Sequence, residues 1–145
     1  MSITMTKNEI RKFLLQGTLT GKLGTINEDG RPHVVPIWYT LDEHENIIFN
    51  TGGDSVKAKN IKRDNRVRLC VDDQSPLFSF VVIDGSAQIE KGLSSEIYKW
   101  AKIIAARYMG DDKSEEYGRR NSGEGEILVR IKPTRIFGQK DIAGW

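Results

Sequence analysis

Short segments with the composition of β-strands follow one another along most of the chain and limit the folds that it can adopt. Residues 18–26 alternate in side-chain character with period two, Asp29 and Gly30 interrupt the pattern, and residues 33–41 continue as a second strand, which predicts a β-hairpin. Further strand-like segments cover residues 47–51, 67–71, 77–83, 86–89, 127–131 and 135–138. We therefore predict a mainly β (α+β) fold, an antiparallel barrel of six or seven strands with short flanking helices.

Three helices are expected between these strands. Thr6 to Glu9 form a capping-box pattern that opens a helix over residues 6–16, and Asp54 or Ser55 caps a second helix from residue 56 to about 64. A longer helix is expected over residues 95–109, and residues 111–126 are polar enough to be a loop with at most one helical turn. Asp84-Gly85 joins two strands or forms a bulge within one long strand.

Composition indicates one folded domain, residues 1–145. The chain has 145 residues, of which 38% are hydrophobic and 29% charged, as in ordinary globular proteins. No apolar stretch is long enough to span a membrane and charges interrupt the N-terminal segment, so we expect a cytoplasmic protein without a membrane partner. Cys70 is the only cysteine and His33 and His44 the only histidines, so no metal site is expected. Within its apolar strand, Cys70 is interpreted as a small core residue.

Residues 51–64 have the pattern of an anion-binding helix start. Gly52 and Gly53 end a strand, and the capped helix that follows carries Lys57 and Lys59 in its first turns. The first N–H groups of a helix lack intrahelical acceptors and lie at the positive end of the helix dipole, so a phosphate is stabilised there. Six basic residues and one acid lie between residues 55 and 68. The alternative is that this charge marks only a solvated helix face.

Residues 34–39 suggest a second part of the same site. Pro36 cannot donate a hydrogen bond to a ladder, which places this strand at an edge, a bulge or an opening of the barrel. An opening of this kind offers apolar side chains and free main-chain groups to a flat heteroaromatic ring. The alternative is that Val35, Ile37 and Tyr39 belong to the core and that Trp38 packs on the next strand.

In order along the chain, residues 30–39, 49–51, 55–64, 66–67, 70–73 and 81–87 together resemble the flavin/deazaflavin oxidoreductases, which are split β-barrels of the pyridoxamine-5′-phosphate-oxidase type. The resemblance covers about residues 10–140 and is strongest to the small branch that depends on the deazaflavin coenzyme F-420. It implies a homodimer with cofactor sites at the interface and coenzyme F-420 or FMN as the cofactor. The cofactor-binding positions that it implies are Val35, Pro36, Ile37, Trp38, Asn50, Thr51, Ser55, Lys57, Lys59 and Asn60.

The same resemblance suggests that residues 76–80 and 141–145, including Trp145, reach the site of the other subunit. The substrate motif of genuine pyridoxamine-phosphate oxidases is missing, so vitamin-B6 oxidation is not expected.

The expected activity is transfer of a hydride between the cofactor and a small, conjugated organic substrate. The sequence assigns no catalytic residue; Tyr39 is the candidate considered for the proton donor. The alternative is a non-catalytic protein that binds FMN, haem or another tetrapyrrole. Nucleic-acid binding through residues 55–68 is not expected, because exposed aromatic residues are not interleaved with the basic ones.

Overall fold

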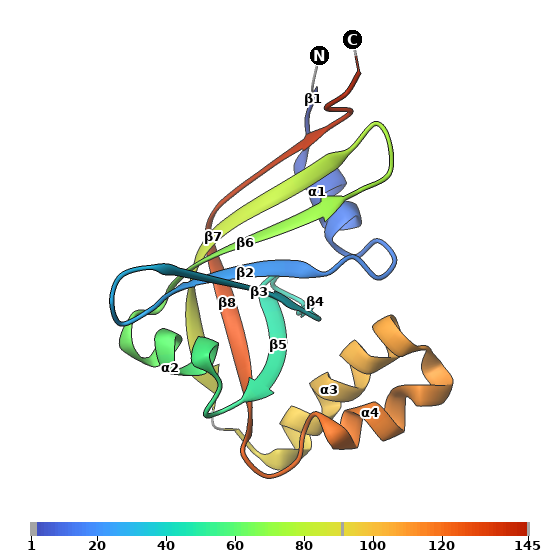
Figure 1. The fold of residues 1–145 in the computed structure, drawn as a ribbon. Coiled ribbons are helices and arrows are strands. Elements are labelled where there is room, and N and C mark those ends of the chain that lie inside the picture. The colour runs from blue at the N-terminus through green and yellow to red at the C-terminus, as the bar shows by residue number, and fades with distance from the viewer. Residues whose placement is uncertain (1–2, 91, 145) are drawn as a thin grey trace.

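The computed structural model describes residues 3–90 and 92–144, and in this part of the chain an antiparallel sheet curls into a half-barrel (Figure 1). Its hydrogen-bonded order is β3-β2-β6-β7-β8-β5-β4, and β1 pairs with the end of β8. The strands are β1 (Ile3–Thr4), β2 (Gly21–Ile26), β3 (Pro32–Ile37), β4 (Thr40–Leu41), β5 (Ile47–Gly52), β6 (Arg66–Asp73), β7 (Ser79–Glu90) and β8 (Glu126–Lys140). The predicted mainly β, antiparallel split-barrel architecture is confirmed.

The inner face of the sheet holds the main core. Burial alternates along β2, as the period-two pattern requires, and Leu23 of this strand is fully buried. Tyr39, Phe49 and Leu69 are also fully buried in the same cluster. A second, smaller cluster lies on the other face of β5, where Ile48 packs with residues of the long helix.

Within the described segments, four α-helices and one 3-10 turn flank the sheet: α1 (Lys7–Leu14), α2 (Val56–Arg63), α3 (Ser94–Met109), η1 (Asp111–Lys113) and α4 (Ser114–Arg120). The capping box is present at the start of α1, and Ser55 rather than Asp54 caps α2. The expectation of a loop with at most one helical turn was wrong for residues 111–120, whereas residues 121–125 do form a loop. α4 is a helix that packs antiparallel to α3, with Gly118 close to the backbone of Lys102 (Figure 1).

β7 and β8 are each one continuous strand, where the sequence allowed or favoured two separate strands. β7 runs through Asp84 and Gly85 with a shift of register between them, which is the bulge alternative. β8 continues through Pro133, where an interruption was expected. The pairing of β5 with β8 ends at Ile131, so the missing N–H of Pro133 breaks no hydrogen bond on that side.

The edge position predicted for the strand of Pro36 is confirmed, because β3 ends the hydrogen-bonded path of the sheet. Cys70, in contrast, is not a core residue. It lies between the buried Leu69 and Val71, on the outer face of β6, and is only partly buried. Of the helices in the described segments, none is sufficiently long and apolar to cross a membrane.

Candidate functional site

A cavity of about 320 Å³ lies where the ends of β3 and β5 and the start of α2 meet the α3–α4 helix pair. Its lining is half polar, with two cations and one carboxylate among the side chains. The lining residues are Pro36, Ile37, Trp38, Asn50, Thr51, Gly52, Lys57, Ala101, Ile104, Arg120, Asn121 and Glu126.

The start of α2 is held in place by short polar contacts. The Ser55 hydroxyl accepts a hydrogen bond from the Ala58 amide at 3.2 Å and lies 3.1 Å from the hydroxyl of Thr51, so the cap joins the helix to the end of β5. The buried Asn60 amide donates to Thr25 Oγ1 at 3.0 Å and to Asn27 Oδ1 at 2.9 Å. Both residues therefore fix the helix against the sheet.

Lys57 is the cation that this arrangement places in the cavity. Its side chain is partly buried, and burial lowers the pKa of the ammonium group while the charge of Glu126 opposes that shift. Within residues 3–90 and 92–144, no hydrogen bond or ion pair joins Lys57 to a carboxylate. A partly buried ammonium group that faces a cavity is well suited to bind an anion.

Trp38 forms an aromatic wall between the sheet and the helix pair. Its ring is stacked on Tyr108 of α3, with centroids 5.2 Å apart and an interplanar angle of 4°, and it is tilted against Tyr117 of α4 at 6.4 Å. The guanidinium group of Arg107 lies over the rings of Tyr39 and Tyr108 and donates to four backbone carbonyl groups. These contacts fix the position of Trp38 beside the cavity.

Asn50 provides an acceptor in the same lining. Its Nδ2 donates to the Ile97 carbonyl at 3.4 Å, whereas its buried Oδ1 has no hydrogen-bond partner. An acceptor without a partner costs free energy unless a ligand or a water supplies a donor. The cavity thus combines cations with an acceptor and an aromatic wall, as a phosphorylated and partly apolar ligand requires.

Six of the ten predicted cofactor-binding positions line this cavity: Pro36, Ile37, Trp38, Asn50, Thr51 and Lys57. The other four do not. Val35 lies on the inner face of β3, Ser55 and Asn60 position α2, and Lys59 is exposed to solvent. A role in cofactor binding remains a prediction for all ten.

Tyr39 does not lie on the cavity, contrary to its consideration as a proton donor. Its side chain is fully buried, and its hydroxyl group donates to the Leu14 carbonyl at 2.5 Å. Burial raises the pKa of this phenol well above its ordinary value. Tyr39 is therefore part of the core, as the alternative interpretation of its strand proposed.

Five lining residues were missed by the sequence analysis, and all come from the helix pair or the strand after it: Ala101, Ile104, Arg120, Asn121 and Glu126. The apolar face of α3 could have indicated Ala101 and Ile104. No local signal marks the others, because their position depends on how α4 packs against α3.

The two segments expected to reach a second subunit contact each other. The amide of Ile142 donates to the Phe78 carbonyl at 3.1 Å, and that of Ala143 donates to the Leu77 carbonyl at 3.0 Å. Trp145 lies outside the described residues. Whether these segments contact another subunit remains a prediction.

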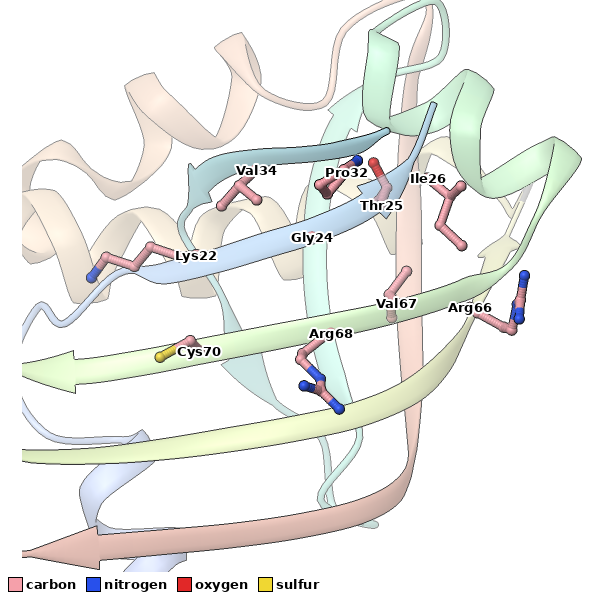
Figure 2. A pocket seen from close by; sticks show the side chains of 10 residues that line it. All are labelled: Lys22, Gly24, Thr25, Ile26, Pro32, Val34, Arg66, Val67, Arg68 and Cys70. Atoms are coloured by element: carbon pink, nitrogen blue, oxygen red, sulfur yellow. The ribbon is translucent and has the colours of Figure 1, made fainter. Parts of the chain in front are cut away.

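A larger cavity of about 440 Å³ contains none of the predicted cofactor-binding residues. It lies on the outer face of β2, β3 and β6, as Figure 2 shows, and its exposed lining is mostly apolar. The lining residues are Lys22, Gly24, Thr25, Ile26, Pro32, Val34, Arg66, Val67, Arg68 and Cys70.

Comparison with known proteins shows the family. The profile of the family described as pyridoxamine 5′-phosphate oxidase matches residues 6–140. A 5a,11a-dehydrotetracycline/5a,11a-dehydrooxytetracycline reductase from Streptomyces rimosus is 37% identical over 90 residues, which are 57% of this chain and 62% of the relative. The match thus spans less than two thirds of that reductase.

Solved structures show the same fold. A conserved hypothetical protein from Mycobacterium tuberculosis has a TM-score of 0.80 and 28% identity, over 92% of this chain and 84% of that protein. A structure described as an F-420 reductase has a TM-score of 0.69 and 24% identity, over 86% of this chain and 94% of the reductase.

Proposed function

The chain belongs to the pyridoxamine 5′-phosphate oxidase family, and from this membership we propose that it is a reductase that uses coenzyme F-420 or FMN. The cofactor would bind in the cavity between β3, β5, α2 and the α3–α4 pair. The observation that carries the proposal is Lys57, a partly buried ammonium group that forms no hydrogen bond or ion pair with a carboxylate of the described residues, in one cavity with Trp38 and the edge strand. The related tetracycline-intermediate reductase supports a conjugated organic substrate.

The residues of the cavity fit a phosphorylated flavin or deazaflavin. Lys57 and the first turn of α2 would hold the phosphate, since N–H groups and positive charge coincide there. Asn50 Oδ1 would accept a hydrogen bond from the ligand, and Trp38 with Pro36 would cover an apolar face of the ring.

When bound, the cofactor supplies the hydride. The protein contributes mainly position and exclusion of water: Trp38, Ala101 and Ile104 form an apolar wall, and the Arg107 contacts keep α3 against the sheet. No side chain of the described cavity is assigned as the proton donor.

We also propose a homodimer that forms through the outer face of β2, β3 and β6. Val34 is 61% exposed at the centre of this apolar face (Figure 2). The cations at its rim are paired within the chain: Lys22 with Asp72 at 2.7 Å and Arg68 with Asp84 at 2.5 Å. A face that is apolar and internally neutralised suits association with an identical copy.

The test of the cofactor proposal is fluorescence titration of the purified protein with coenzyme F-420 and with FMN. Truncation of Lys57 to alanine should weaken binding by about 10-fold or more, since a charged contact contributes about 1.5–3 kcal/mol. Lys12→Ala is the matched control, because Lys12 is exposed on α1 and does not line the cavity, and it should change Kd less than about threefold.

The apparent melting temperature of the cofactor-free protein should be nearly unchanged in both variants. Equal affinities of the wild type and Lys57→Ala would remove Lys57 from the site. A Soret band with added haem, and no response to either flavin, would favour the tetrapyrrole-binding alternative.

A further inference from the structure

We propose that Glu126 takes up a proton when an anionic group binds beside Lys57, so that ligand affinity depends on pH and on the charge of the ligand. This inference rests on the proposed function, because it concerns the same cavity. Glu126 would then determine how strongly the affinity of the cavity depends on the negative charge of the ligand.

Backbone contacts between distant segments bring Glu126 to the anion-binding end of the cavity. Glu126 is the first residue of β8 and is paired in register with Gly52, the last residue of β5. The Gly53 amide donates to the Gly125 carbonyl at 2.7 Å, and a Cβ atom on Gly53 would lie only 3.1 Å from that oxygen. The close approach of the two glycines therefore places the carboxylate beside the start of α2.

Two charged groups act on Glu126, and a third lines the same cavity. Lys57 of α2 and Arg120 of α4 line the same cavity, and Asp54 belongs to the turn before α2. The Glu126 carboxylate forms no hydrogen bond and no ion pair with any residue of the described chain, so it is available to titrate.

Burial raises the pKa of Glu126, as does the charge of Asp54, while Lys57 lowers it. The carboxyl group is therefore already easier to protonate than an exposed one. A phosphate held by Lys57 adds negative charge close to the carboxylate and favours the protonated form further.

The direction of the pH effect follows from linkage. Because the ligand-bound state has the higher pKa at Glu126, binding takes up a fraction of a proton at pH values between the free and bound pKa. Affinity for the anion is therefore highest below this interval, falls as the pH rises through it, and is constant above it as far as Glu126 is concerned.

Glu126→Gln tests the inference, because glutamine has nearly the shape of protonated glutamate but cannot titrate. Kd and proton uptake are measured from pH 5 to 8 by calorimetry in two buffers of different ionisation enthalpy, with FMN or coenzyme F-420, whichever binds. Riboflavin, which lacks the phosphate, serves as the ligand control. Glu124→Gln is the matched protein control, since Glu124 is exposed in the same loop and does not line the cavity.

We expect Glu126→Gln to bind the phosphorylated ligand about fivefold or more tightly than wild type at pH 8, because one repulsive charge at short range is removed. The variant should lose the proton uptake seen in wild type, and Glu124→Gln should retain it. The FMN phosphate has a second pKa of about 6, so proton uptake above pH 7, where this group is ionised in all variants, is the comparison that reports Glu126.

Two results would count against the inference in different ways. Binding of the phosphorylated ligand with the same Kd and the same proton uptake in wild type and Glu126→Gln would overturn the role of Glu126 and leave the cofactor proposal intact. Failure of wild type and both variants to bind either cofactor would overturn the proposed function, and this inference with it.

Discussion

Replacement of Arg107 by methionine should destabilise the protein, because it removes contacts that hold α3 against the rest of the fold. The guanidinium group donates to the carbonyl oxygens of Gly17 at 2.9 Å, Tyr39 at 2.8 Å and Leu14 at 2.8 Å. It also lies 4.7 Å and 5.0 Å from the ring centroids of Tyr39 and Tyr108. These contacts join the C-terminal half of α3 to the segment after α1 and to the end of the edge strand.

The magnitude follows from the acceptors that lose their donor. Methionine retains the apolar stem of the side chain, so packing changes little. The Leu14 carbonyl keeps the hydroxyl of Tyr39 as a donor, which leaves the oxygens of Gly17 and Tyr39 as the main losses. The partly buried Tyr39 acceptor at about 1 kcal/mol, the exposed Gly17 acceptor at about 0.5 kcal/mol and two cation–π contacts at about 0.5–1 kcal/mol each give a loss of about 3 kcal/mol.

Urea denaturation followed by circular dichroism measures this loss directly. A loss of about 3 kcal/mol corresponds to a decrease in Tm of about 9 °C for a domain of this size. Arg119→Met is the control, since Arg119 is exposed on α4, and it should change stability by less than about 0.5 kcal/mol. Equal stabilities of the two variants would show that the Arg107 contacts do not hold α3 in place.

Three further changes test other parts of the structure. Asn60→Ala should cost about 2 kcal/mol of unfolding free energy, because it removes the buried hydrogen bond to Thr25 of β2 and the part-buried one to Asn27 just after β2. Thermal denaturation would detect the loss. Gly118→Val should lower the free energy of unfolding by about 2 kcal/mol, because a Cβ at this position would lie 3.1 Å from the Cα of Lys102. An unchanged Tm in thermal denaturation would contradict this close packing. Burial raises the pKa of the Cys70 thiol, so alkylation by iodoacetamide, which requires the thiolate, should begin at higher pH than in a cysteine peptide. If the outer face forms the dimer, Val34→Glu should convert a wild-type dimer into a monomer in sedimentation and speed this alkylation; a variant that stays dimeric would place the interface elsewhere.

The end of the cavity that holds Lys57, where we propose that an anion binds, could be predicted because its signals are local. The glycines at the end of β5, the cap at Ser55 and the lysine in the first turn of α2 are contiguous in the sequence, and each has a direct structural meaning. Pro36 similarly indicated an edge strand from the chemistry of one residue. The antiparallel barrel followed from the repeated alternation of side chains.

The wall of the cavity formed by α3, α4 and the start of β8 could not be predicted, because its position depends on contacts between residues that are distant in the sequence. α4 is short, charged and interrupted by Gly118, so its sequence has no apolar face; the helix forms because Gly118 allows close packing on α3. Glu126 reaches the cavity through the contact of Gly53 with Gly125, which no local pattern shows. Cys70 was assigned to the core because its strand was taken as uniformly apolar, whereas alternate residues of β6 face outward.

A crystal structure of the protein with bound FMN or coenzyme F-420 tests the central claim most directly. The account predicts a phosphate within hydrogen-bond distance of Lys57 Nζ at the start of α2, with the ring system beside Trp38 and Pro36. A phosphate bound instead in the outer cavity between β2, β3 and β6, or a ring system that does not approach Trp38, would contradict it.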